Sequence, residues 1–217
     1  MDSPKPQELI SLLEPDKCAL LVVDKQEGYI GSDQPLIKLR NTNTEQLKKI
    51  MTQLDIFIDE ARRINIPVIW TKMVENVDES PANISLKMRI GNTPSVIKST
   101  DKSFEIYGHA RPKQDEKVII KKRFDAFIGT DLDEHLKKNQ RSTLVLTGGY
   151  ASRCLLATSF VGNSLGYNIA WAKDLVGVPD IFMKELPIAI GIVDSILGYT
   201  FESSELLSVW KNQLGVI

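Results

Sequence analysis

The chain has 217 residues, of which 42% are hydrophobic and 25% charged, and its formal net charge is −1. These values suit a folded unit with a sizeable core. They argue against an electrostatic surface for nucleic acid or membranes. No apolar run reaches membrane-spanning length, and the first residues lack the apolar core of a signal peptide. We therefore expect a cytoplasmic protein with a single domain over residues 1–217.

Short apolar runs alternate with helical patterns along the chain. A strand buried on both faces is predicted at residues 18–23, and further strands are predicted at 68–71, 118–120, 144–146 and 168–172. Helical spacing marks residues 47–61, behind a predicted capping box of Thr42 and Glu45, and then residues 131–138, the segment after Cys154, and 182–197. The last dozen residues are expected to form an edge strand and a tail. This alternation predicts a Rossmann-like α/β fold, with three α/β/α layers around a mostly parallel sheet of about six strands.

The turn at residues 147–154 reads Thr-Gly-Gly-Tyr-Ala-Ser-Arg-Cys, between a strand and a helix. This order places Cys154 in the first turn of the helix, where free N–H groups and the helix dipole favour the nucleophilic thiolate. We expect these groups and Lys121 to lower the apparent pKa of Cys154 below the ~8.5 of a free thiol, with Asp24 opposing them. The alternative is a small buried cysteine at a strand–helix junction.

Three predicted strands end in chemically complementary residues, namely Asp24, Lys121 and Cys154. Ligands of open parallel sheets bind beyond the carboxyl ends of the strands. We expect the three strands to be adjacent in one parallel sheet, where a carboxylate could take the thiol proton and an ammonium could stabilise both anions. Taken singly, Asp24 could be a turn residue and Lys121 a solvated charge.

These residues lie in three motifs. Residues 24–29 (DKQEGY) resemble D-x-Q-x-x-[FY], residues 121–132 (KKRFDAFIGTDL) resemble K-x-R-[YF]-x-A-F-x-G-T-D-L, and residues 147–154 resemble T-G-x-x-[TA]-x-x-C. In this order they resemble the isochorismatase-like cysteine hydrolases over most of residues 17–176. The resemblance implies an Asp24–Lys121–Cys154 triad, and its register selects Lys121 over Lys122. It also implies a cis peptide at Gly149–Tyr150, an oxyanion hole of the Tyr150 and Cys154 N–H groups, and a homo-oligomer.

Two departures from this family pattern narrow the expected chemistry. Nicotinamidases of the family carry a D-x-H metal site, which the two histidines, His109 and His135, do not reproduce. We therefore expect no metal and no nicotinamidase activity. Isochorismatases proper often have glycine at the cysteine position, but Tyr150-Ala151 resembles their turn. The motif at residues 147–154 therefore combines features of isochorismatases with the cysteine of the cysteine hydrolases.

The residues favour a cysteine-dependent hydrolase that cleaves a C–N bond in a small amide or ureido substrate through a thioester, without a cofactor. The alternatives are isochorismatase-type vinyl-ether hydrolysis, with Asp24 as the acid, and a non-catalytic oligomeric family member. The expected partner is a small molecule, with no nucleic acid and no membrane. The apolar residues of span 73–116 and of Phe201–Trp210 would be exposed in a monomer and support a homo-oligomer.

The remaining expectations concern the surroundings of the site. The loop-rich span 73–116 is typical of a functional or interface element. Cys18 is expected in the core, Lys25 at the pocket rim or in solvent, and His135 on the surface, while His109 is a loop candidate near the site. Phe124 is a further candidate for the pocket wall, and the residues expected to contact the substrate are Gln26, Tyr29, Phe127 and Gly149.

Overall fold

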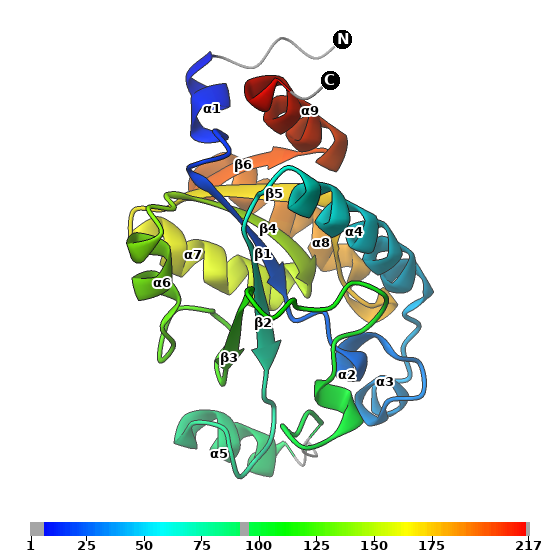
Figure 1. Cartoon of the computed structure of the whole chain (residues 1–217). Coiled ribbons are helices and arrows are strands. Elements are labelled where there is room, and N and C mark those ends of the chain that lie inside the picture. The colour runs from blue at the N-terminus through cyan, green and yellow to red at the C-terminus, as the bar shows by residue number, and fades with distance from the viewer. Residues whose placement is uncertain (1–6, 92–95, 216–217) are drawn as a thin grey trace.

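A computed structural model gives the fold and describes residues 7–91 and 96–215. Within these residues, six strands form one all-parallel sheet in the order β3-β2-β1-β4-β5-β6 (Figure 1). The strands are β1 (Cys18–Val23), β2 (Val68–Met73), β3 (Lys117–Lys121), β4 (Thr143–Gly149), β5 (Asn168–Gly177) and β6 (Gly198–Phe201). This sheet confirms the predicted Rossmann-like α/β class, and the order puts β1 and β4 at its centre.

Helices cover both faces of the sheet (Figure 1). The long α4 (Glu45–Arg63) and α9 (Ser203–Leu214) pack together on one face, and α7 (Leu156–Ser164) packs against β5 on the other. The other helices are α1 (Gln7–Leu12), α2 (Glu27–Ile30), α3 (Pro35–Leu39), α5 (Ala82–Ile90), α6 (Leu132–Lys138) and α8 (Leu186–Ile192). Short 3₁₀ segments lie at Lys102–Phe104 and Asp180–Glu185, and single π-helical turns lie at Ala151–Leu155 and Val193–Leu197.

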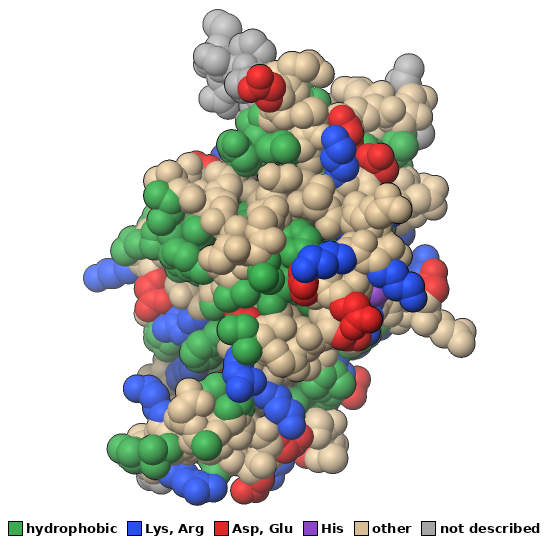
Figure 2. Space-filling view, turned by 90° about the vertical axis from the view of Figure 1, so that its left-hand side faces the viewer, with side chains coloured by type: hydrophobic (Ala, Val, Ile, Leu, Met, Phe, Trp, Pro, Cys, Tyr) green, Lys and Arg blue, Asp and Glu red, His purple; other side chains and the backbone are tan. Residues whose placement is uncertain are grey.

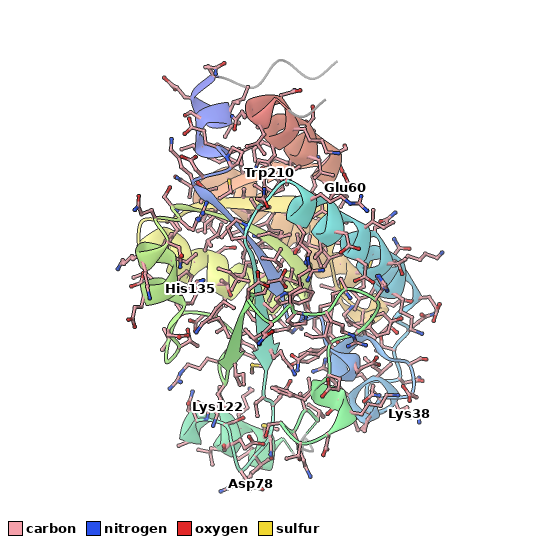
Figure 3. The ribbon with its side chains drawn as sticks, viewed as in Figure 1. Lys38, Glu60, Asp78, Lys122, His135 and Trp210 are labelled. Carbon is pink, nitrogen blue, oxygen red and sulfur yellow. The ribbon has the colours of Figure 1, made fainter. Side chains whose placement is uncertain are left out.

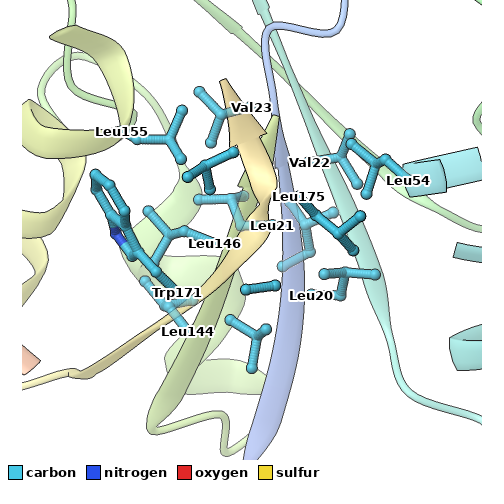
Figure 4. Packing of buried hydrophobic residues seen from close by; sticks show 14 of the residues in the cluster. Leu20, Leu21, Val22, Val23, Leu54, Leu144, Leu146, Leu155, Trp171 and Leu175 are labelled. Atoms are coloured by element: carbon cyan, nitrogen blue, oxygen red, sulfur yellow. The ribbon is translucent and has the colours of Figure 1, made fainter. Parts of the chain in front are cut away.

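Strand β1 is buried along its whole length because both of its faces are covered by helices. Successive side chains of a strand point to opposite faces. Leu20 and Val22 accordingly lie on the side of Leu54 from α4, while Val23 lies toward Leu155 (Figure 4). Burying a leucine-sized side chain stabilises a fold by about 1.5–3 kcal/mol relative to exposure. The burial on both faces therefore holds β1 firmly in the middle of the sheet.

The C-terminal segment corrects two expectations from the sequence. Residues 203–214 form α9 rather than an edge strand and tail, and the edge strand β6 precedes them. Phe201 and Trp210 are buried rather than exposed, with the Trp210 ring 5.8 Å from that of Phe57 on α4. Figure 3 shows Trp210 beneath α9, close to the sheet. The buried Leu206 and Trp210, four residues apart, form the apolar side of this helix.

Two other elements also differ from the prediction. Helix α4 begins at Glu45 with Thr44 as its N-cap, so Thr42 and Glu45 form no capping box, and the Asn43 side chain accepts the Glu45 N–H instead. The span 73–116 contains α5, whose Leu86 and Ile90 are exposed; its residues 92–95 lie outside the described part. Among the described residues, no helix is long and apolar enough to cross a membrane.

Candidate active site

Asp24 follows the last residue of β1 in a left-handed backbone conformation, with φ of 46°. Non-glycine residues adopt this conformation rarely, and aspartate is among those that tolerate it best. The Asp24 N–H points to Thr71 on β2, and the Thr71 hydroxyl donates a 2.5 Å hydrogen bond to Oδ1. These contacts hold the buried carboxylate at the carboxyl end of the sheet.

Gly148 allows β4 to lie close to the end of β1. Its φ is +99°, and a Cβ at this position would lie 2.3 Å from the Val23 carbonyl oxygen. Any side chain here would therefore push β4 away from β1. The glycine keeps the turn that carries Cys154 beside the end of the strand that carries Asp24.

Lys121 ends β3. The expectation that this strand lies next to β1 is wrong, because β2 lies between them. The long side chain spans this gap by passing over the end of β2, with Nζ 3.5 Å from the Met73 sulfur. Nζ lies 2.7 Å from Asp24 Oδ2 and also donates to the carbonyl oxygens of Arg123 and Phe124. Lys121 is fully buried, so the two charges face each other without solvent.

Cys154 lies in the helical turn Ala151–Leu155, which continues into α7, and the Gly149–Tyr150 peptide before it is cis. Cys154 is 6% exposed, and its thiol interacts with both the Asp24 carboxylate and the Lys121 ammonium. The structure therefore brings together all three residues that the sequence placed at strand ends.

The pKa of Cys154 is raised and not lowered, contrary to the expectation from the sequence. Burial raises the pKa of Cys154 most, and the Asp24 carboxylate raises it further, while Lys121 lowers it. Burial alone would lower the pKa of Lys121, but Asp24 and Cys154 overcome this effect, and the net direction is upward. The resting site thus holds a neutral thiol beside an Asp24–Lys121 ion pair. The sequence could not show how completely this turn is buried.

Gln26 and Lys25 hold the loop that leaves β1. The Gln26 side chain accepts from Met73 N–H and donates to the Met73 and Phe104 carbonyls, so it extends the pairing of β1 with β2. The Lys25 side chain is fully buried rather than at a rim or in solvent, and its Nζ lies 2.7 Å from an Asp55 carboxylate oxygen on α4. Burial lowers the pKa of Lys25, and Asp55 opposes that shift.

A cavity of about 70 Å³ lies beside the thiol. Its wall is formed by three aromatic residues, three charged residues and the cysteine: Tyr29, Phe124, Tyr150, Arg40, Glu75, Arg153 and Cys154. Tyr29 and the candidate Phe124 therefore line it. Gln26, Phe127 and Gly149 do not, although they were expected to contact the substrate. Phe127 is buried and stacks on Tyr167 instead.

The charged wall residues were missed from the sequence. Arg40 follows α3, Glu75 follows β2, and Arg153 precedes the cysteine. No periodic pattern marks the first two, since both lie in connections whose position depends on tertiary packing. Arg153 was visible next to Cys154, but only the fold shows that its side chain faces this cavity.

The other candidates lie away from this cavity wall. Cys18 is fully buried in the core as expected, and burial raises its pKa to about 12. His109 is exposed, and its backbone N–H donates to Asp55. His135 is half-buried on α6, on a flank of the molecule (Figure 3). Within residues 7–91 and 96–215, no three His, Cys, Asp or Glu side chains cluster as metal ligands.

Comparisons with known proteins agree with this fold. A family model of the isochorismatase domain matches residues 18–186. The chain is 26% identical over 191 residues to the secreted isochorismatase effector Isc1 of Verticillium dahliae, over 86% of this chain and 88% of that protein. It is also 26% identical over 144 residues to N-carbamoylsarcosine amidase of an Arthrobacter species, over 64% of this chain and 54% of that protein.

Among solved structures, a cysteine hydrolase from Pseudomonas syringae pathovar phaseolicola superimposes with a TM-score of 0.79 at 18% identity, covering 92% of this chain and 95% of that one. At this identity the likeness shows the fold alone. The family model, by contrast, spans well over half of the sequence. The chain therefore belongs to the isochorismatase family of hydrolases.

Proposed function

We propose that the protein is a cysteine-dependent hydrolase that cleaves the C–N bond of a small amide or ureido substrate through a thioester. The observation that carries this proposal is the buried Cys154 thiol in contact with both Asp24 and Lys121, at the wall of a small cavity. A nucleophile, a base and a charge that orients the base are thus in reach of one another.

The first half of the reaction uses Asp24 as the general base. Its carboxylate takes the Cys154 proton as the sulfur attacks the substrate carbonyl carbon, and the carbonyl electron pair moves to oxygen. Backbone N–H groups of Tyr150 and Cys154 are our candidates for holding that oxygen, since the first turn of a helix leaves N–H groups unpaired. Collapse breaks the C–N bond, and the proton on Asp24 passes to the leaving nitrogen.

The second half returns the enzyme to its resting state. Asp24 takes a proton from water, the hydroxide attacks the thioester carbonyl, and the C–S bond breaks. The thiolate then recovers its proton from Asp24, and the acid product leaves. Lys121 stays charged throughout and stabilises whichever of the two partners is anionic. This sequence of steps requires no cofactor.

Vinyl-ether hydrolysis with Asp24 as the acid is the second candidate function. It is favoured by the Tyr150-Ala151 turn and by the likeness to a protein described as an isochorismatase effector. The amide reading gains support from the likeness to an N-carbamoylsarcosine amidase. The position of Cys154 beside Asp24 favours amide hydrolysis over vinyl-ether hydrolysis, because the vinyl-ether reaction leaves the thiol without a role.

A screen of small primary amides and ureido acids for ammonia release tests the proposal. Cys154→Ala should lower turnover by roughly 10³-fold or more, because the nucleophile is lost. Cys18→Ala is the matched control and should retain turnover, since Cys18 lies in the core. Equal turnover by wild type and Cys154→Ala would contradict the cysteine mechanism. Isochorismate hydrolysis that survives alkylation of Cys154 would support the second candidate instead.

A further inference from the structure

The cavity beside Cys154 holds two opposite charges that are not paired with each other. Arg40 and Glu75 both lie in its wall, yet they form no ion pair within 4.0 Å among the described residues. Both charges act on Tyr150, whose ring lies in the same wall: Arg40 lowers its pKa and Glu75 raises it, while burial raises it most. The wall therefore contains one positive and one negative group that both lie close enough to act on the same aromatic ring.

Arg40 is the cation that lacks a protein anion. Its Nη1 is buried and has no hydrogen-bond acceptor in the described part of the chain. Buried donors in proteins normally have a partner. Its guanidinium lies 5.5 Å from the Phe182 ring centroid, a contact that orients the group without neutralising it.

Arg153 differs from Arg40 although it packs on the same ring. It lies 3.7 Å from the Phe182 ring centroid, and its Nη1 lies 2.7 Å from Glu185 and 2.8 Å from the Ser152 hydroxyl. Its charge is therefore already matched within the protein. Of the two arginines in the wall, Arg40 is the one available for an anionic ligand.

Glu75 supplies the negative group of the wall. Its Oε2 accepts a 3.0 Å hydrogen bond from the Tyr29 hydroxyl, and no cation lies within 4.0 Å of it among residues 7–91 and 96–215. A carboxylate in this position accepts hydrogen bonds from N–H groups of a ligand and repels a second anionic group.

We infer that this pocket selects a substrate with one carboxylate, bound by Arg40, and with an amide or ureido N–H group directed at Glu75. Neutral amides and dianions are both disfavoured, the first because Arg40 stays unpaired and the second because Glu75 repels it. A guanidinium forms strong charge-assisted hydrogen bonds with a carboxylate. This inference rests on the proposed function for the scissile bond, but it concerns binding and is tested without turnover.

Three probes of nearly equal size separate these cases: malonamide, malonamate and malonate, which are neutral, singly charged and doubly charged at about pH 8. Binding to Cys154→Ala protein is measured by ligand-observed NMR titration, so that no probe is consumed. We expect malonamate to bind about tenfold more tightly than malonamide, the effect of one charged hydrogen-bonding contact. Malonate should also bind more weakly than malonamate.

Variants assign the effect to the two residues. Arg40→Gln should remove the preference for malonamate over malonamide and leave malonamide binding unchanged, whereas Arg40→Lys should retain part of it. Glu75→Gln should strengthen malonate binding, because the amide oxygen can still accept from Tyr29 without repelling the ligand. Arg89→Gln, at an exposed position of α5 that is not part of the cavity wall, removes the same charge and should change nothing.

The outcomes separate this inference from the proposed function. Equal loss of all three probes in Arg40→Gln would show a structural role only and overturn the inference. Equal affinities for malonamide and malonamate in the Arg40-containing protein would also overturn it, as would the absence of binding by all three. Amide hydrolysis that fails to depend on Cys154, together with malonamate binding that depends on Arg40, would leave the inference standing while the proposed function falls.

Discussion

Lys121 Nζ lies 2.7 Å from Asp24 Oδ2 although a whole strand, β2, separates the strands from which the two residues come. The reach of the lysine over Met73 makes this possible, and the Gln26 contacts with Met73 hold the end of β2 in place beneath it. The geometry of the ion pair therefore depends on the ends of three strands, β1, β2 and β3.

The two members of this ion pair should shift the pKa of the Cys154 thiol in opposite directions. Asp24 raises the pKa of Cys154 and Lys121 lowers it. Asp24→Asn should therefore increase the rate of iodoacetamide alkylation of Cys154 at about pH 8, and Lys121→Met should decrease it, each by about tenfold, the factor given by one pKa unit. The rate is followed by peptide mass spectrometry. Equal rates in both variants and wild type would place the thiol outside the field of the pair.

The same Asp24→Asn variant should lose amide hydrolysis while its thiol becomes more reactive, because the base is missing but the thiolate is easier to form. Exposure of the thiol by unfolding would accelerate alkylation in Lys121→Met as well. The opposite signs of the two variants therefore separate an electrostatic effect from a structural one.

The sequence indicated that the three candidate site residues lie together, because one rule brings the ends of their strands to the same edge of the sheet. Strands of a parallel sheet end at the same edge, so polar residues that follow apolar runs meet there, as Asp24, Lys121 and Cys154 do. Choosing Lys121 over Lys122 needed the family motif, because strand alternation alone did not decide it. The neighbours Arg40 and Glu75 lie in connections, whose position depends on contacts distant in sequence.

The burial of Lys25 is indicated in the sequence by the position of its partner, Asp55. Asp55 lies between Leu54 and Ile58 on the buried side of α4, where a carboxylate is expected only with a partner. That position predicts a buried cation elsewhere in the chain. The sequence alone cannot say which of many lysines it is, since the pairing depends on the packing of α4 against the end of β1.

We expect Lys25→Met to destabilise the protein by about 3–5 kcal/mol, because it leaves the Asp55 charge buried without its partner. The double variant Lys25→Met, Asp55→Asn should recover part of this loss, since the buried charge is removed and the amide oxygen can still accept from one of the His109 and Ala110 N–H groups, which now bond to separate carboxylate oxygens. Urea unfolding measures both free energies. A single variant as stable as wild type would contradict the pairing.

The buried thiols should make stability fall above about pH 8.5. Cys18 ionises with a pKa of about 12 in the folded state but near ~8.5 when unfolded. The native state therefore holds the proton more tightly, and stability decreases as pH rises through this window. Between pH 7 and pH 10, the fall in unfolding free energy should be smaller in Cys18→Ala than in wild type, by about 2 kcal/mol. Equal falls would show that Cys18 is not deeply buried.

We also expect a homo-oligomer, as the family resemblance implies. The C-terminal residues do not support this, but Ile188 and Ile196 are 64% and 67% exposed, and hydrophobic side chains gather on the face shown in Figure 2. Large exposed apolar areas commonly mark interfaces. Sedimentation velocity at micromolar concentration should give a mass at least twice 24.3 kDa, and a single species near 24.3 kDa would contradict the expectation.

The central claim is that the substrate acyl group passes through the sulfur of Cys154. Intact-protein mass spectrometry after rapid acid quench, during turnover of a small amide identified in the screen, tests it most directly. The account predicts an added mass equal to the acyl group, located by peptide mapping on Cys154 and absent from Cys154→Ala. Steady turnover by an enzyme that retains activity when Cys154 is replaced by alanine, with no acyl adduct at any time, would contradict it.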